Sequence, residues 1–328
     1  MTVSIVDPGP LGMLLSALLH LKGIPVAFQP RASAPCGGRI RVNLPGGRLL
    51  VEGLDPEPSD GASPFLLAME GSGPMDREAF KRLMGRPARP QQPSVTDQDA
   101  PMGAFINTLR DGAERPDIKP SPWETCLVLA EPVMLDGACV ELEGPEAAVV
   151  VPRGSRVAGL LSSLGSFGFS FHAVEDMSPY LDSYRVLKLL DLPVAMCNTT
   201  RTHFLSFPEG RQIAAHVLEE GLLACRKTGG KAGRLPVSDP TELMRRMGRN
   251  PRAFEAARFL PDRCFNPALQ RLMRGGVLDP KGHNRRVVEK AAGAGLNLEW
   301  NWKLCQKVSR IHGAGFFLGP AELLAAIG

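Results

Sequence analysis

The opening stretch of the chain, residues 3–28, constrains the fold most. A short apolar run, Val3–Val6, breaks at the Asp-Pro-Gly-Pro segment 7–10 and gives way to leucines at helical spacing over residues 11–21. Gly23 then closes the helix, and residues 24–28 have the composition of a second strand. This pattern of strand, tight turn, helix and strand predicts a βαβ unit with parallel strands.

More strand signals follow in the first half of the sequence. Residues 39–42 and 48–51 flank a Pro-Gly-Gly turn and predict a hairpin, and Asp136-Gly137 predicts a second hairpin between residues 133–135 and 138–142. The segment 86–122 contains seven prolines and predicts irregular surface chain around a short strand. Further strands are expected at residues 64–69, 104–106, 124–130 and 147–151, and a short helix at residues 76–84.

The second half of the sequence has a helical pattern. A length of 328 residues favours two domains. We therefore expect an α/β Rossmann-like N-terminal domain over residues 1–176, followed by an all-α C-terminal domain over residues 177–328. Its helices are expected at residues 178–198, 209–228, 239–248, 267–273, 282–295 and 300–312.

Composition excludes several classes of protein. The net charge is only +4 and no basic run occurs, so nucleic acid is not an expected partner. Seven scattered cysteines without a CxxC pair indicate reduced thiols and no metal site, which is typical of a cytoplasmic protein. The longest apolar stretch, residues 11–21, is too short to span a bilayer, so no membrane association is expected.

The turn after the first strand resembles a dinucleotide-binding turn. The fingerprint GxGxxG appears as Asp7-Pro8-Gly9-Pro10-Leu11-Gly12, with the second and third glycines retained. Gly9, Leu11 and Gly12 are the expected cofactor contacts, because a helix N-terminus there would face the pyrophosphate. Asp7 adds a negative charge and Pro10 lacks an amide donor. A Rossmann-shaped turn that holds no dinucleotide is therefore the alternative.

Arg31 follows the second strand and bears on the choice of cofactor. NAD enzymes usually carry an acidic residue at this point, whereas NADP enzymes accommodate an arginine beside the 2′-phosphate. The sequence therefore favours NADP, with Arg31 as a cofactor ligand. A solvated surface arginine is the alternative.

These features together resemble the ketopantoate reductase (2-dehydropantoate 2-reductase) family. The resemblance rests on the Pro-Gly-Pro-Leu-Gly turn, Arg31, the Asp136-Gly137 hairpin, the helical second half, and residues 266–270 followed by Asp279 and Asn284. It implies a divergent member with a Rossmann domain joined to a helical domain. It also implies a reductase that transfers a hydride from NADPH to a carbonyl.

The resemblance assigns roles to particular residues. It implies that Asp279 assists catalysis and substrate binding, and that Asn107, Asn198 and Asn284 bind substrate. Simpler structural alternatives stay open: Asp279 as the N-cap of the helix at 282–295, and Asn198 as a helix C-terminal residue. Pro267 stands where the family has a substrate-binding serine.

The catalytic lysine of the family has no direct match. When Asn198 is aligned with a family asparagine, Leu190 occupies the lysine position and Lys188 lies two residues earlier. Two residues rotate a helical side chain by about 200°, unless Pro193 locally rewinds the helix. Lys188 is our candidate acid, with an exposed helix lysine as the alternative.

The sequence therefore predicts an NADPH-dependent reductase of a small 2-oxo acid or related carbonyl other than ketopantoate, acting in a cleft between domains. The expected partner is a small-molecule substrate, and a homodimer is allowed for. Two alternatives remain: a non-catalytic binding or scaffold protein that retains the two-domain shell, and a non-redox enzyme that uses the same cleft.

Overall fold

The structure is a computed structural model in which the chain divides into two compact units. Unit 1 comprises Met1–Val128 and Val149–Val174, and unit 2 comprises Leu129–Ala148 and Glu175–Gly328. The structure describes residues 3–6, 10–29, 39–44, 47–52, 65–69, 102–106, 123–130, 132–134, 139–142, 146–259, 283–314 and 317–328. The short helix expected at 76–84 and the helix expected at 267–273 lie outside these residues.

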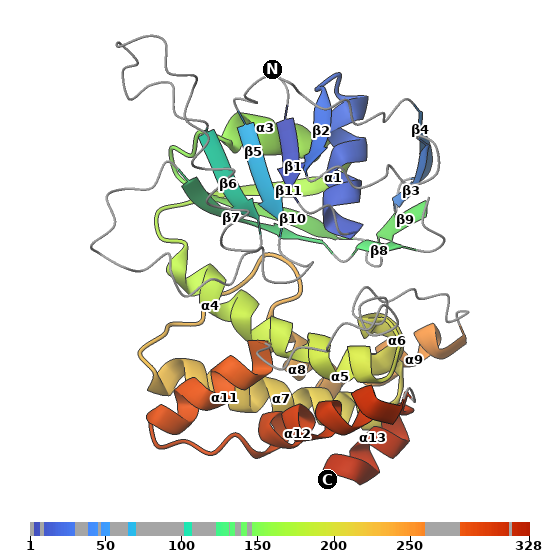
Figure 1. Ribbon diagram of the computed structural model, residues 1–328, viewed down its shortest axis with the longest axis vertical. Helices are drawn as coiled ribbons and strands as arrows, with labels where there is room; N and C mark the ends of the chain where they lie inside the picture. Colours follow the sequence, from blue (N-terminus) through green and yellow to red (C-terminus); the bar gives the residue numbers. More distant parts are fainter. Residues whose placement is uncertain are drawn as a thin grey trace. The chain divides into compact units, whose positions relative to one another are not determined.

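Unit 1 is built on a seven-stranded sheet with the order β11-β10-β7-β6-β5-β1-β2 (Figure 1). Strand β1 pairs in parallel with β2 on one side and with β5 on the other, so that Val3 lies opposite both Val26 and Phe65. The predicted βαβ unit is confirmed. The strands are β1 Val3–Val6, β2 Val26–Gln29, β5 Phe65–Met69, β6 Met102–Ile106, β7 Trp123–Leu129, β10 Ala147–Pro152 and β11 Phe169–Val174.

The core of this sheet follows from strand composition. Val149, Val150 and Val151 of β10 are fully buried in succession, as expected for an interior strand covered on both faces. Strand β11 lies at the sheet edge and buries Phe169 while neighbouring positions are exposed. Strand β11 is not predicted from the sequence, because its serines and histidine interrupt the apolar pattern.

Helix α1, Pro10–Leu21, follows β1 and packs on the β1–β2 end of the sheet (Figure 1). Leu14, Leu15, Leu18 and Leu19 are fully buried and form its packed face. Gly23 ends the turn after the helix with a φ of 70°, a left-handed conformation that glycine adopts without strain.

Both predicted hairpins are confirmed. Strands β3 Ile40–Leu44 and β4 Gly47–Val51 pair antiparallel, as do β8 Pro132–Met134 and β9 Cys139–Leu142. Helix α3 Ala158–Ser162 and the 3-10 helix η3 Ser163–Phe167 precede the edge strand β11.

The main body of unit 2 is helical and is organised around α7, Pro208–Lys227, which contacts α4, α6, α8, α11, α12 and α13. Gly221 allows a close approach, because a Cβ there would lie 2.4 Å from Leu189 Cδ1. The other helices are α4 Ser178–Leu187, η4 Lys188–Leu190, α5 Asp191–Met196, α6 Arg201–Ser206, α8 Pro240–Arg249, α9 Arg252–Glu255, η5 Ala256–Phe259, α11 His283–Gly293, α12 Glu299–Ala314 and α13 Pro320–Ile327.

The single helix predicted over residues 178–198 is wrong: it is broken into α4, the 3-10 turn η4 and α5. Pro193 explains the break, because it has no N–H to donate to the carbonyl of Leu189 and its ring crowds that carbonyl. The freed Leu189 oxygen instead accepts a hydrogen bond of 2.9 Å from the Asn284 side chain. None of the helices in the described ranges is long and apolar enough to cross a membrane.

Candidate functional site

The first candidate region lies in unit 1 and is the junction of β1 and α1. In the sheet order, β1 lies between β5 and β2, so the chain proceeds to opposite sides from this strand. Ligands of open parallel sheets bind outside the carboxyl ends of the strands at such a switch point. Helix α1 begins at Pro10, just beyond the carboxyl end of β1. The geometry therefore favours a ligand at this end of the sheet.

The backbone of the first turn of α1 is suited to an anion. The N–H groups of Leu11 and Gly12 have no carbonyl partner within the helix, as in the first turn of any α-helix. Gly12 is buried and Leu11 is half-buried. Two expected cofactor ligands, Gly9 and Arg31, lie outside the described residues.

The second candidate region lies in unit 2 and is the break between α4 and α5. Lys188 opens the 3-10 turn there, and its ammonium forms an ion pair with Asp191. The other carboxylate oxygen of Asp191 lies 3.1 Å from the Arg201 guanidinium. The Lys188 side chain keeps 26% of its surface exposed. It is therefore held by a carboxylate and still accessible.

The carboxyl group of Asp191 is strongly influenced by these two cations. Burial acts to raise its pKa, but the attraction of Lys188 and Arg201 and their hydrogen bonds outweigh it, so the pKa lies below the usual value. Asp191 is therefore ionised near neutral pH, and its carboxylate is paired with two cations, Lys188 and Arg201.

Leu190, the residue at the family lysine position, lies in the core. It is fully buried, as is Leu189. A 3-10 turn advances about 120° per residue, compared with about 100° in an α-helix. The break therefore changes which side chains face the core and which face solvent. Of the two candidates for the lysine position, only Lys188 presents a charged group with exposed surface.

Asn284 has a structural position. It is 4% exposed, and its amide nitrogen donates to the Leu189 carbonyl and to Asn301 Oδ1, each at 2.9 Å. Asn301 in turn donates to Val217 and Glu220 on α7. Both amide hydrogens are used in these bonds, which tie α11 to the α4–α5 break. A role of Asn284 in substrate binding stays a prediction.

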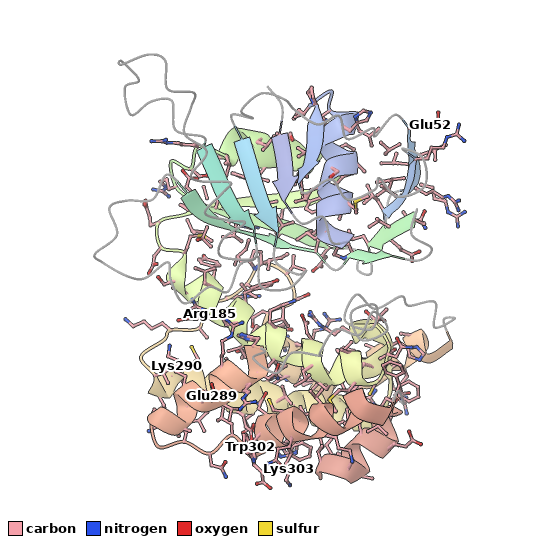
Figure 2. The ribbon with its side chains drawn as sticks, viewed as in Figure 1. Glu52, Arg185, Glu289, Lys290, Trp302 and Lys303 are labelled. Carbon is pink, nitrogen blue, oxygen red and sulfur yellow. The ribbon has the colours of Figure 1, made fainter. Side chains whose placement is uncertain are left out.

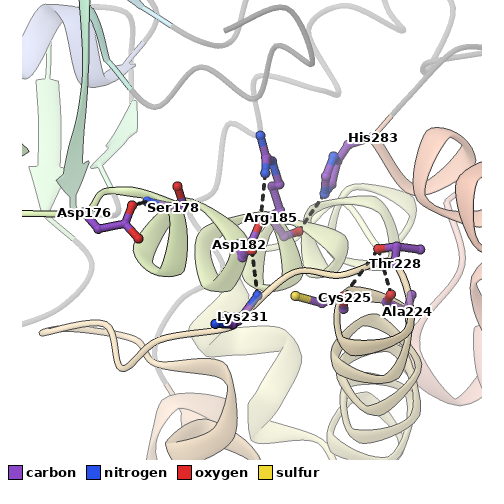
Figure 3. A network of polar contacts seen from close by, with 9 residues as sticks. All are labelled: Asp176, Ser178, Asp182, Arg185, Ala224, Cys225, Thr228, Lys231 and His283. Atoms are coloured by element: carbon purple, nitrogen blue, oxygen red, sulfur yellow. Dashed lines mark hydrogen bonds and ion pairs between the residues drawn. The ribbon is translucent and has the colours of Figure 1, made fainter. Parts of the chain in front are cut away.

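The neighbouring residue His283 is bonded to the last turn of α4, just before the break (Figure 3). Its Nε2 lies 2.6 Å from the Arg185 carbonyl and therefore donates to it. Burial lowers the pKa of His283 to about 4, with the Lys188 and Arg286 cations adding to the effect, so the ring is neutral near pH 7.

The polar network in Figure 3 fixes α4 to the segment after α7. Asp182 accepts from the Arg185 guanidinium at 2.8 Å and from the Lys231 backbone N–H at 3.0 Å. Asp182 is not among the residues predicted from the sequence. Its contribution is to hold the helix that leads to Lys188.

Asn198 ends α5 in a left-handed conformation with a φ of 47°. Its N–H donates to the Ala195 carbonyl, and its Oδ1 is buried and accepts no hydrogen bond from any residue that the structure describes. The helix C-terminal position is thus observed, which leaves a role in substrate binding as a proposal. Asn107 and Asp279 lie outside the described residues.

Sequence reasoning also missed Asp191, Arg201 and His283. The spacing of Lys188 and Asp191, three residues apart on a helix, was a readable signal for an ion pair. The approach of Arg201 and His283 depends on tertiary packing, which no local pattern contained. Across the described part of the chain, no group of three or more His, Cys, Asp or Glu residues could hold a metal ion.

Comparison with known proteins identifies the fold. No family model matches the sequence, and no curated protein matches it. A PanE/ApbA family ketopantoate reductase from Ralstonia eutropha superposes with a TM-score of 0.63 at 17% identity, covering 96% of this chain and 99% of that one. A 2-dehydropantoate 2-reductase from Geobacter metallireducens gives a TM-score of 0.67 at 15% identity, covering 94% and 99%.

A third solved structure, D-mandelate dehydrogenase with NADH and anilino(oxo)acetate, gives a TM-score of 0.64 at 11% identity, covering 96% of this chain and 99% of that one. The chain therefore has the fold of the ketopantoate reductases, at a low level of sequence identity. The resemblance found in the sequence is confirmed at the level of the fold.

Proposed function

We propose that this protein is an NADPH-dependent reductase of a small 2-oxo acid or a related carbonyl compound. The observation that carries the proposal is the switch point at β1, flanked by β5 and β2, with α1 starting beside it. Two structural neighbours are named 2-dehydropantoate 2-reductase and D-mandelate dehydrogenase, and the latter was solved with NADH.

The β1–α1 junction fits a dinucleotide through its backbone. Gly12 is buried, and the N–H groups of Leu11 and Gly12 would receive the pyrophosphate. Arg31, after β2, would bind the 2′-phosphate of NADPH. Asp7 and Pro10 weaken this site chemically without removing these donors.

When bound, the nicotinamide would supply the hydride for the carbonyl carbon. The ammonium of Lys188 would protonate the carbonyl oxygen as negative charge develops on it. Asp279, Asn107 and Asn198 complete the proposed site, with Asp279 orienting the acid and the two asparagines positioning the substrate. Pro267 in place of the family serine favours a substrate other than ketopantoate.

A binding or scaffold protein is the second candidate. The chemical departures at Asp7 and Pro10 favour it, because a chain that no longer binds dinucleotide can still keep the sheet and helix geometry. The two candidates differ in one measurable property, the affinity for NADPH.

A fluorescence titration of NADPH with increasing protein separates them. We expect saturable enhancement of NADPH fluorescence, followed by oxidation of bound NADPH when aliphatic and aryl 2-oxo acids are added in turn. No saturation at high micromolar cofactor would contradict the reductase and favour the scaffold. Saturable binding without oxidation by any carbonyl compound would contradict the proposed reaction.

A further inference from the structure

One carboxylate lies between two cations at the α4–α5 break. Asp191 Oδ2 pairs with the Lys188 ammonium, and Asp191 Oδ1 lies 3.1 Å from an Arg201 guanidinium nitrogen. The three charged groups come from η4, α5 and α6. Each oxygen of the carboxylate therefore serves a different cation.

The backbone explains why Lys188 and Asp191 meet. Residues three apart are eclipsed in a 3-10 helix, which completes a turn in three residues, so Asp191 lies directly along the helix from Lys188. The break that creates this turn follows from Pro193, which leaves the Leu189 carbonyl to Asn284. The pair is thus a consequence of the interrupted helix.

Arg201 reaches Asp191 from the first turn of the next helix. The N-cap of α6 is Thr200, whose hydroxyl accepts from the His203 N–H at 3.0 Å. This cap fixes the start of α6, and the Arg201 side chain is only 15% exposed. The guanidinium is therefore held in place rather than free to leave the carboxylate.

Other described groups also lie near Lys188 or its neighbour His283. The Tyr184 ring of α4 lies 5.9 Å from the Lys188 ammonium, and His283 of α11 is neutral near pH 7. Arg286 of α11 acts on the same histidine and adds a further positive charge on this side. Helix α7 meets η4 through Gly221.

We propose that Asp191 and Arg201 are positioning residues for the proton donor: Asp191 fixes the Lys188 ammonium and increases its affinity for the proton, while Arg201 shares the carboxylate and limits that increase. The proposal rests on the proposed function, in which Lys188 protonates the product oxygen. The two residues act on the same ammonium in opposite directions.

The first experiment needs no activity. Lysines are reductively methylated with ¹³C-formaldehyde, the Lys188 signal is identified by its loss in Lys188→Arg, and its pKa is followed by NMR. We expect Asp191→Asn to lower that pKa by about half a unit to one unit and Arg201→Gln to raise it by a smaller amount. Glu299→Gln, which breaks the Lys303–Glu299 pair on α12, is the matched control and should leave Lys188 unchanged.

The second experiment uses the reaction. The alkaline limb of the pH profile of kcat should move down in Asp191→Asn and up in Arg201→Gln, while KM for NADPH stays within about twofold. Asp191→Glu should restore most of the wild-type profile. Loosened packing would move both variants in the same direction, so opposite shifts distinguish positioning from a purely structural role.

Two failures can be told apart. A wild-type protein that oxidises no NADPH refutes the proposed function, and the NMR titration still tests Asp191 and Arg201. Unchanged pKa values of Lys188, or shifts of the same sign in both variants, would overturn the positioning proposal even in an active reductase.

Discussion

The proposed roles of the β1–α1 junction and of the α4–α5 break depend on different parts of the chain, the backbone at the junction and a side chain at the break. At β1–α1, the proposed ligand would meet backbone N–H groups and a close helix–strand approach, and these depend on the turn and on Gly12. At the α4–α5 break, the proposed chemistry depends on the ammonium of Lys188 and on its direction. A site made of backbone groups can persist when side chains are substituted. A site that depends on one side chain is lost when that residue changes, unless another residue takes its place.

The α4–α5 break bears on this point, because it changes the helix around the candidate acid Lys188. A continuous helix would have placed Lys188 about 200° from the side of Leu190. In the interrupted helix, Leu190 is fully buried, whereas Lys188 is partly exposed and paired with Asp191. The difference between the regions predicts that substitutions at the break affect chemistry, while substitutions at the turn affect cofactor affinity.

Removing the Lys188 amine should have the largest effect. Loss of a positioned proton donor lowers rates by about 10² to 10⁴, so Lys188→Ala should reduce kcat by this factor with little change in NADPH affinity. Steady-state kinetics and fluorescence titration measure the two quantities. Lys303→Ala, which removes an ion-paired lysine from α12 (Figure 2), is the control and should retain activity. Equal losses in affinity and kcat would break the proposed separation of the two regions.

Acid should destabilise the folded protein through His283, which is bonded to α4 next to the α4–α5 break. Its folded pKa of about 4 lies below the ordinary value of 6.5, so the unfolded chain binds the proton more readily. The stabilisation is complete above about pH 6.5 and decreases as the pH falls toward 4, by up to about 3 kcal/mol.

Urea unfolding of wild type and His283→Gln across this pH range tests that prediction. The glutamine keeps a donor for the Arg185 carbonyl but does not titrate, so the dependence should flatten. His172→Gln on β11 serves as the control and should keep the wild-type dependence. An identical decrease in both variants would mean that His283 is not the titrating group.

Arg31 should determine the choice between cofactors. A charge-assisted hydrogen bond to phosphate contributes about 1 to 3 kcal/mol, so NADPH should bind at least about tenfold more tightly than NADH. Arg31→Ala should remove this difference. Competitive titrations with both cofactors measure it, and a variant that discriminates as well as wild type would exclude Arg31 as the phosphate ligand.

Restoring the turn should have the smallest effect. Asp7→Gly combined with Pro10→Ala removes a negative charge and returns an amide donor at the start of α1. We expect NADPH affinity to increase by about two- to fivefold, with kcat unchanged. No gain in affinity would indicate that the dinucleotide does not contact this turn.

The sequence predicted the sheet region better than the helical break. The run Val3–Val6, the Gly23 stop and the Asp136-Gly137 turn are local signals, and the structure confirms the βαβ unit and both hairpins. Strand β11 was not predicted, because an edge strand needs only one apolar face and its sequence pattern is therefore weak.

The candidate site was less predictable because it depends on contacts between distant residues. Lys188 and Pro193 were identified from the sequence. A local rewinding of the helix at Pro193 was stated there as the condition under which Lys188 could serve as the acid. The link from Asn284 to the Leu189 carbonyl joins residues 95 positions apart, and Arg201 meets Asp191 only after α5 ends. Such pairings follow from tertiary packing and not from periodicity.

Hydrogen exchange with and without saturating NADPH tests the central claim most directly. The account predicts that NADPH slows exchange of the amides in residues 3–21, above all those of Leu11 and Gly12, while the amides of α12 are unaffected. Unchanged exchange throughout residues 3–21 in the presence of NADPH would contradict a dinucleotide site at the β1–α1 junction.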